Sequence, residues 1–350
     1  MKFKSIVLVF NLILFQVAVL AQPKAKNVIF MIGDGMGINQ VYAAMTANGG
    51  HLNLEKCTAS GYSKTYSANK YITDSAAGGT ALATGTKTNN NMLGVAPDSV
   101  TKLWSSLYFA KEQGLSTGIV VTVSVTHATP ASFYAHQTSR NMRREITQDL
   151  LKSDIDVIIG GGLNNFNKKT KVQFEAKNYQ IVETEEGLEN LRQGKVLALL
   201  ASKDLPSASK RGEMLPNSVE KAISILSQDT AGFFLMVEGS QIDYQGHARN
   251  TTELINEMLD FDKAIGKALD FAEQDGNTLV VITADHETGA FTILDGNFET
   301  GEVKGKFNSF YHTGVPVPVF AYGPGSEQFN GWQENTDFRD KILNALNIKL

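Results

Sequence analysis

The sequence has a single cysteine, Cys57, among its 350 residues. One cysteine excludes an internal disulfide, so the hydrophobic core must stabilise the fold without a covalent crosslink. It also excludes a cysteine-rich zinc site, so any metal must be bound by His, Asp, Glu or hydroxyl groups. We interpret Cys57 as a small, partly buried side chain and not as a reactive thiol.

Charge is sparse as well. Charged residues make up 19% of the chain and hydrophobic residues 42%, a composition typical of a globular protein and not of a disordered one. There is no internal repeat, no low-complexity tract and no dense basic cluster. We therefore expect no nucleic-acid recognition.

Long apolar runs are absent except at the start of the chain. After a short basic beginning, Ile6–Leu20 is almost wholly apolar. A membrane anchor is the alternative, but the run is short and contains Asn11 and Gln16. We predict a secretory signal peptide over residues 1–21, cut after Ala21, with no membrane anchor after cleavage. The mature protein, residues 22–350, is then periplasmic or secreted.

Short apolar runs rich in Val, Ile and Phe alternate with helical patterns along the mature chain. The runs are typical of strands buried on both faces of a parallel sheet, and they span Asn27–Ile32, Ser116–Val123, Ile155–Ile159, Phe233–Val237, Thr278–Thr283 and Pro316–Tyr322. The helical patterns include Ile38–Ala47, Leu103–Gln113, Val219–Leu226 and Thr251–Glu273. This alternation predicts the α/β class, with a mostly parallel central sheet and helices on both faces.

Residues from about 164 to 215 are more polar than the rest. We interpret them as a peripheral elaboration of one domain that spans residues 22–350.

Polar residues stand where three of the predicted strands stop. Asp34 follows the first strand, Glu238 follows Phe233–Val237, and Asp285 with His286 follow Thr278–Thr283. A single Asp after a strand is usually a turn or helix cap. Because ligands bind outside the carboxyl ends of strands in open α/β sheets, three such groups together favour a site at that edge.

Asp243 and His247 are four residues apart. If the segment is helical, the two side chains lie on one face and can share a metal ion. Gly246 between them weakens a helix, so a solvated helix face with an incidental His is the alternative.

The six histidines fall into two groups. His127, His247, His286 and His312 each lie in a polar or Gly-rich motif, whereas His51 and His136 do not, and we assign the latter two structural roles only.

Ser75 begins a run of small residues that can form a helix. A helix that starts there points free N–H groups at an anion, and small side chains leave room for it. The alternative is an ordinary Ser or Asp helix cap. Arg140 can bind two phosphoryl oxygens at once, although an isolated Arg is more often a surface residue.

Together these motifs resemble the alkaline phosphatase family. The resemblance runs from Asn27 to Gly325, and it rests on the order and identity of Gly-Asp34-Gly-Met-Gly, Thr-Asp74-Ser75-Ala-Ala, His127-Ala-Thr129-Pro with Arg140, Met-Val-Glu238-Gly, Asp243 with His247, Thr-Ala-Asp285-His286 and His312-Thr-Gly.

The resemblance implies a three-layer sandwich that hydrolyses phosphate monoesters and releases inorganic phosphate, with two Zn²⁺ and one Mg²⁺ as cofactors. Ser75 is the implied nucleophile, which forms a phosphoserine intermediate, and Arg140 binds the substrate phosphate. The implied ligands are Asp243, His247 and His312 for the first zinc, Asp34, Ser75, Asp285 and His286 for the second, and Asp34, Thr129 and Glu238 for magnesium. Since family members are often homodimers, a homodimer is one expectation.

Chemistry fits these roles. A Ser hydroxyl is a weak nucleophile, and zinc coordination lowers its pKa without a Ser–His–Asp triad. A zinc pair can also hold both apical oxygens of an in-line displacement.

His127 and Tyr244 depart from one bacterial version of the pattern, which carries Asp and Lys there. An imidazole in place of a carboxylate puts the identity of the third metal in doubt, because magnesium prefers oxygen ligands. Loss of the Lys removes a positive charge near the phosphate, so we expect weaker retention of product.

Two other functions compete with a phosphomonoesterase. A phosphodiesterase or sulfatase of the same superfamily is the first, but Ser75 lacks the Cys/Ser-x-Pro-x-Arg setting of a sulfatase, and Arg140 favours a dianionic monoester. Comparing rates on a monoester and its methyl diester separates these enzymes. The second is a non-catalytic protein that binds metal or phosphate, which the intact ligand set and Ser75 disfavour.

Overall fold

The computed structural model describes residues 24–349. The predicted signal peptide lies outside the described residues. Within them, no helix has the length and apolar character needed to cross a membrane.

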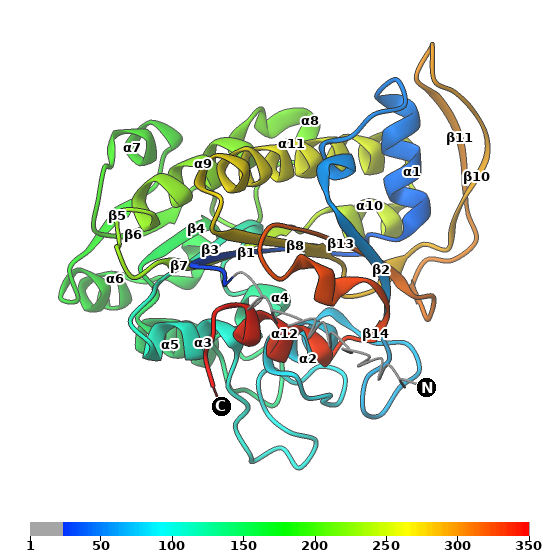
Figure 1. The fold of residues 1–350 in the computed structure, drawn as a ribbon. Coiled ribbons are helices and arrows are strands. Elements are labelled where there is room, and N and C mark those ends of the chain that lie inside the picture. Colours follow the sequence, from blue (N-terminus) through cyan, green and yellow to red (C-terminus); the bar gives the residue numbers. More distant parts are fainter. Residues whose placement is uncertain (1–23, 350) are drawn as a thin grey trace, which may run out of the picture.

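A ten-stranded sheet runs through the centre of the molecule (Figure 1). Its strand order is β14-β2-β13-β8-β1-β7-β3-β4-β6-β5, and every pair is parallel except the two that involve β13. These strands are β1 (Asn27–Gly33), β2 (Ala59–Lys64), β3 (Ser116–Ser124), β4 (Val157–Gly161), β5 (Tyr179–Val182), β6 (Lys195–Leu199), β7 (Phe233–Gly239), β8 (Thr278–Thr283), β13 (Val317–Tyr322) and β14 (Gly331–Glu334).

Two small antiparallel pairs complete the strands. They are β9 (Glu287–Thr288) with β12 (His312–Thr313), and β10 (Phe291–Asn297) with β11 (Glu302–Phe307). The β10–β11 hairpin extends away from the body of the molecule beside α1 (Figure 1).

Helices cover both faces of the sheet, as predicted (Figure 1). One face carries α1 (Ile38–Ala47), α7 (Glu185–Asn190), α8 (Ala208–Arg211), α9 (Met214–Leu226), α10 (Ile242–Ala248) and α11 (Thr251–Asp275). The other carries α2 (Ser75–Thr84), α3 (Ser106–Glu112), α4 (Ala128–Ala131), α5 (Arg143–Ser153), α6 (Lys168–Glu175) and α12 (Asp337–Ala345). Short 3₁₀ turns lie at η1 (Asn53–Lys56), η2 (Leu163–Asn165) and η3 (Ser326–Phe329).

The alternation of side chains along β1 explains the two halves of the core. Phe30 belongs to one buried cluster, and its ring stacks on Phe338 with centroids 5.8 Å apart. Its neighbours Ile29 and Met31 belong to the cluster on the opposite face. Because successive strand residues point to opposite faces, a continuous apolar run is what a strand covered on both sides requires.

The predicted strands over 27–322 are all present, but one prediction was wrong. Pro316–Tyr322 was expected to be parallel, and β13 pairs antiparallel with both β2 and β8. An apolar run does not specify strand direction, which depends on how the chain enters the strand. Residues 164–215, expected at the periphery, supply β5 and β6 at one edge of the sheet.

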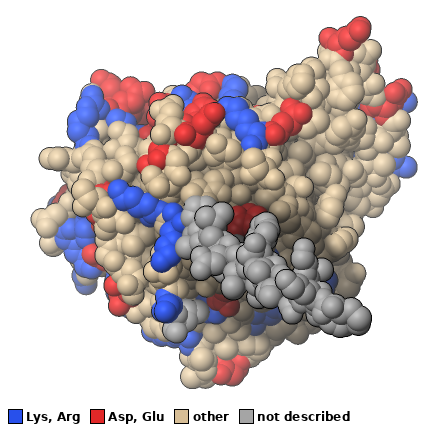
Figure 2. Space-filling model, viewed as in Figure 1, with Lys and Arg blue, Asp and Glu red and all other residues tan. Residues whose placement is uncertain are grey.

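Charged side chains of both signs are interspersed on the face seen in Figure 2. The described residues visible there form no continuous basic surface.

A buried ion cluster fixes residues 204–211 to α11. The Arg211 guanidinium lies 2.5 Å from Glu257 and 2.6 Å from Asp260, and the three side chains are 1%, 1% and 7% exposed. Arg211 also donates to the carbonyl of Pro206 at 3.0 Å. This cluster therefore holds the loop that leads to Asp204.

We predict that Arg211→Met lowers the free energy of unfolding by about 3–5 kcal/mol, because two buried carboxylates lose their partner. Urea unfolding followed by circular dichroism measures this. Lys263→Met is the matched control, since Lys263 pairs with Glu213 at 2.5 Å while both side chains are 55% exposed. The control changes the free energy by less than about 1 kcal/mol. Equal effects of the two variants would contradict the prediction.

Candidate active site

The carboxyl ends of three adjacent strands, β8, β1 and β7, converge on one edge of the sheet. Asp34 follows β1, Glu238 is the last residue but one of β7, and Asp285 with His286 follow β8. All four side chains are at most 1% exposed. The parallel register of these strands brings Asp34 together with groups that the sequence places more than 200 residues away from it.

Asp34, Asp285 and His286 form the first cluster. The Nε2 atom of His286 lies 3.4 Å from a carboxylate oxygen of Asp34 and 3.2 Å from one of Asp285. The Ser75 hydroxyl lies 3.2 Å from the same Nε2 atom. One ligand atom from each of the first three residues lies within 4.8 Å of the others, which is compatible with a shared metal ion.

Asp243, His247 and His312 form the second cluster with the same spacing of ligand atoms. The segment of Asp243 and His247 is the helix α10, which the sequence had left open, and the two side chains approach within 3.2 Å. His312 comes from β12 and lies 3.5 Å from Asp243. The rings of His286 and His312 stack with centroids 3.5 Å apart, so the two clusters are neighbours.

Main-chain carbonyls set the tautomers of both histidines in the second cluster. His247 Nδ1–H donates to Phe310 at 2.5 Å, and His312 Nδ1–H donates to Thr73 at 2.9 Å. Each ring then presents Nε2 as a lone pair toward the cluster, which is the arrangement of metal-ligating histidines.

Glycines permit the close packing around Asp243. Gly35 has φ of +78°, and a Cβ there would lie 2.7 Å from the Cα of Asp243. A Cβ on Gly246 would lie 2.8 Å from the Thr288 side chain. Gly246 lowers helix propensity, but it lets α10 lie directly against β9, and the Thr288 hydroxyl donates to Asp243 at 2.5 Å.

Thr129 and Glu238 form a third group of side chains near Asp34. The Thr129 hydroxyl donates to Asp34 at 3.4 Å, and Glu238 accepts a 2.6 Å hydrogen bond from Ser240. Four buried atoms here have no hydrogen-bond partner among the described residues: Asp34 Oδ1, Glu238 Oε1, Asp285 Oδ2 and His127 Nδ1. Buried polar atoms are normally satisfied, so this concentration fits residues that ligate cations.

The pKa shifts of the buried carboxyls are also consistent with cation binding. Burial, together with the charges of Asp285, Asp243 and Glu238, raises the pKa of Asp34 well above its ordinary value. Burial likewise raises the pKa of Glu238 to about 8 and the pKa of Asp285 to about 7. Asp243 differs: burial opposes ionisation, but the hydrogen bond to His247 and the nearby imidazoles hold its pKa well below the ordinary value.

Ser75 is the first residue of α2, and Asp74 is its cap. The Asp74 carboxylate accepts from the N–H of Ala77 at 3.0 Å, so Ser75 is not itself the cap. The second oxygen of Asp74 lies 3.2 Å from Arg140 Nη1. Asp74, for which the sequence offered only the alternative of an ordinary helix cap, thus orients both the helix that begins at Ser75 and the Arg140 guanidinium.

His127 and Tyr244 lie next to each other, with ring centroids 6.2 Å apart in an edge-on arrangement. Burial lowers the pKa of His127 to about 3, so its imidazole is neutral. The Tyr244 hydroxyl donates to Asp204 at 3.1 Å, and Asp204 also accepts from the N–H of Ser124 at 2.8 Å. Sequence reasoning missed Asp204, because it lies in a polar loop with no motif around it.

The sequence and the fold both have named relatives. The family model described as alkaline phosphatase matches residues 25–306. Alkaline phosphatase 4 of Bacillus subtilis is 35% identical, with 93% of this chain and 90% of that protein aligned, and the Escherichia coli alkaline phosphatase is 32% identical over 94% and 88%. The solved alkaline phosphatase of the Antarctic bacterium TAB5 is 40% identical, with a TM-score of 0.88 over 94% of this chain and 100% of that one.

A second structure of the TAB5 enzyme is that of a His-to-Asp mutant with Mg bound in its M3 site. The family match thus spans most of the described residues, and the relatives align over more than nine-tenths of the sequence. The chain therefore belongs to the alkaline phosphatase family.

Proposed function

We propose that the protein hydrolyses phosphate monoesters with Ser75 as nucleophile, through a phosphoserine intermediate, and that it uses two Zn²⁺ and one Mg²⁺. The observation that carries the proposal is the position of the Ser75 hydroxyl. It lies at the first residue of α2, 3.2 Å from His286 of the first cluster, with Arg140 held beside it by Asp74.

The ligand sets follow the three groups of side chains. The proposed ligands are Asp243, His247 and His312 for one zinc, Asp34, Ser75, Asp285 and His286 for the other, and Asp34, Thr129 and Glu238 for magnesium. When bound, these cations supply positive charge that lowers the pKa of a serine hydroxyl and neutralises a leaving oxygen.

The protein groups then divide the reaction between them. Arg140 binds two oxygens of the phosphoryl group, and the free N–H groups at the start of α2 face the same anion. Ser75 Oγ attacks phosphorus; the new O–P bond forms while the ester O–P bond breaks and the alcohol leaves. Water then attacks the phosphoserine, which releases inorganic phosphate and restores the Ser75 hydroxyl.

We also propose that residues 1–21 direct export, which fits the periplasmic or secreted location expected from the sequence. A homodimer stays a prediction of the family resemblance.

We predict that Ser75→Ala lowers kcat for 4-nitrophenyl phosphate at least about a thousandfold, because the attacking oxygen is lost. The zinc content, measured by mass spectrometry, stays close to that of the unmodified protein because the other ligands remain. Ser106→Ala is the control: Ser106 is buried, its hydroxyl has no hydrogen-bond partner within residues 24–349, and it lies outside the site. Undiminished turnover in Ser75→Ala would contradict the proposal.

Metal removal is predicted to make stability fall as pH rises. Folded-state pKa values of about 7 for Asp285 and about 8 for Glu238 exceed those of the unfolded chain, so the metal-free protein binds protons that the unfolded chain does not. That stability is lost as these carboxyls ionise. Burial lowers the pKa of His127 and of His286, so these two imidazoles stay neutral while the carboxyls ionise. The hydrogen bond to Asp243 raises the pKa of His247, so any proton that His247 binds is also lost as pH rises and acts in the same direction.

Thermal unfolding of protein freed of metal by dialysis tests this. We expect the melting temperature to fall from pH 7 to pH 9 without metal, and to stay nearly constant with zinc and magnesium bound, because cations replace the protons. A parallel dependence on pH in both forms would contradict the assignment of these carboxylates as ligands.

His127→Asp is predicted to increase retention of magnesium. The neutral imidazole has an unpartnered buried Nδ1, whereas a carboxylate offers the oxygen ligands and negative charge that magnesium prefers. We expect a slower loss of magnesium during dialysis, measured by metal analysis, with zinc unchanged. His51→Asp is the control, because its side chain is 84% exposed and lies outside the metal clusters. If both variants lose magnesium at the same rate, His127 is not near the third metal.

A further inference from the structure

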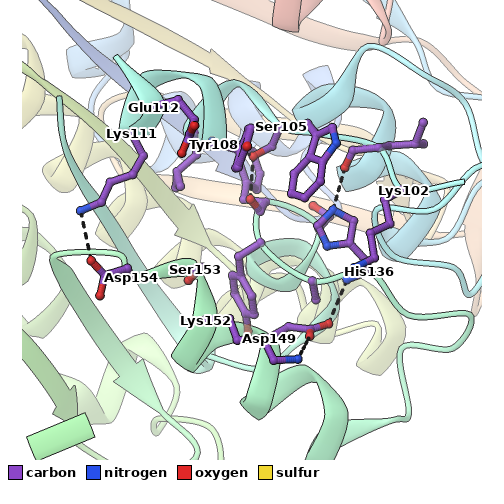
Figure 3. Close-up of a pocket in the computed structure, with 17 residues that line it drawn as sticks. Lys102, Ser105, Tyr108, Lys111, Glu112, His136, Asp149, Lys152, Ser153 and Asp154 are labelled. Atoms are coloured by element: carbon purple, nitrogen blue, oxygen red, sulfur yellow. Dashed lines mark hydrogen bonds and ion pairs between the residues drawn. The ribbon is translucent and has the colours of Figure 1, made fainter. Parts of the chain in front are cut away.

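A cavity lies away from the proposed metal ligands, between α3, α5 and the segment that follows α4 (Figure 3). Its volume is about 480 Å³, within the range of small-molecule sites. None of the residues assigned to catalysis or metal binding lines it. It is therefore not an extension of the phosphate site.

Aromatic side chains form one wall of this cavity. The ring of Trp104 lies 4.2 Å from that of Tyr108, tilted by 32°, and His136 lies edge-on to Trp104 at 4.7 Å. Trp104 is nevertheless 40% exposed, and the buried Phe133 and Leu107 also line the space. A partly open indole beside apolar side chains is a surface on which a flat ring can stack.

The charged side chains around the cavity differ in whether they have an ion-pair partner. Asp149 accepts from the N–H of His136 at 3.1 Å and from Gln137 at 2.6 Å. Lys152 lies 3.5 Å from Asp149 and is 76% exposed, and Lys102 has no ion-pair partner among the described residues. Lys152 and Asp149 offset each other, so the spare positive charge at the end of the cavity near His136 is that of Lys102 (Figure 3).

The opposite end is already neutralised in part. Lys111 lies 2.9 Å from Asp156 and 4.0 Å from Asp154. Glu112 is exposed there, on the far side of the cavity from Lys102 (Figure 3). The carboxylate of a ligand is therefore favoured at the Lys102 end of the cavity and disfavoured at the Glu112 end. The two ends thus differ in charge.

We propose that this cavity binds a flat aromatic anion of one or two fused rings. The ring stacks against Trp104 and Tyr108, and the anionic group lies at Lys102. The neutral His136 ring donates from Nε2 to the Leu103 carbonyl at 3.1 Å, so its Nδ1 is left as a hydrogen-bond acceptor. The proposal does not depend on the identity of the catalytic residues.

Isothermal titration calorimetry on the mature, metal-loaded protein tests the proposal with 2-naphthoate as the probe and 2-naphthamide as its uncharged match. Saturating inorganic phosphate is present throughout, so that the active site is occupied. We expect naphthoate to bind and naphthamide to bind more weakly. Lys102→Gln should weaken naphthoate roughly fivefold and leave naphthamide unchanged, as a single charge-assisted contact implies.

Trp104→Phe, which keeps a ring, should weaken both probes less than Trp104→Ala does. Lys169→Gln, at an exposed lysine of α6 that does not line the cavity, is the control and should change neither affinity. The proposal is overturned if naphthoate fails to bind, or if Lys102→Gln and Lys169→Gln have the same effect. Naphthoate binding that is seen only in a parallel titration without phosphate would assign the probe to the active site and would also overturn the proposal.

Discussion

Mutual repulsion among buried carboxylates is the constraint on which the rest of this site depends. Asp34, Glu238 and Asp285 are brought together by three adjacent strands and are shielded from water by helices on both faces of the sheet. Burial and neighbouring charge raise the pKa of each. Burying several ionised carboxylates together raises the free energy of the folded state unless cations or protons compensate their charge. This edge of the sheet therefore favours bound metal ions.

Close backbone packing is the second requirement. The two histidines of the second cluster come from separate elements, α10 and β12, and each is fixed by a main-chain carbonyl. Gly35 and Gly246 allow α10 to approach β9 so closely that Thr288 bonds to Asp243. The two clusters can then lie side by side, with the rings of His286 and His312 stacked between them.

The segment of residues 164–215 reaches the site through one loop. Arg211 fixes that loop to α11, and Asp204 at its start accepts from the Tyr244 hydroxyl. This contact bears on the expectation that product phosphate is held more weakly with Tyr244 than with a lysine at that position. A lysine at that position would face Asp204 at the place where the hydroxyl now bonds, so part of its charge would be neutralised by Asp204 before it could act on a phosphate.

The sequence by itself determined the α/β class, six of the ten strands of the central sheet, several helices, and the side chains that gather at the sheet edge, because apolar periodicity and polar strand ends are local signals. The position of Ser75 in a motif was also readable, although its helix cap proved to be Asp74. Only the tertiary structure decided the antiparallel direction of β13, the strands β2 and β14, and the contacts of Asp204 with Tyr244 and of Arg211 with Asp260. Those features depend on which distant segments meet in space. The sequence of a short polar or alternating stretch does not indicate which segment it will contact.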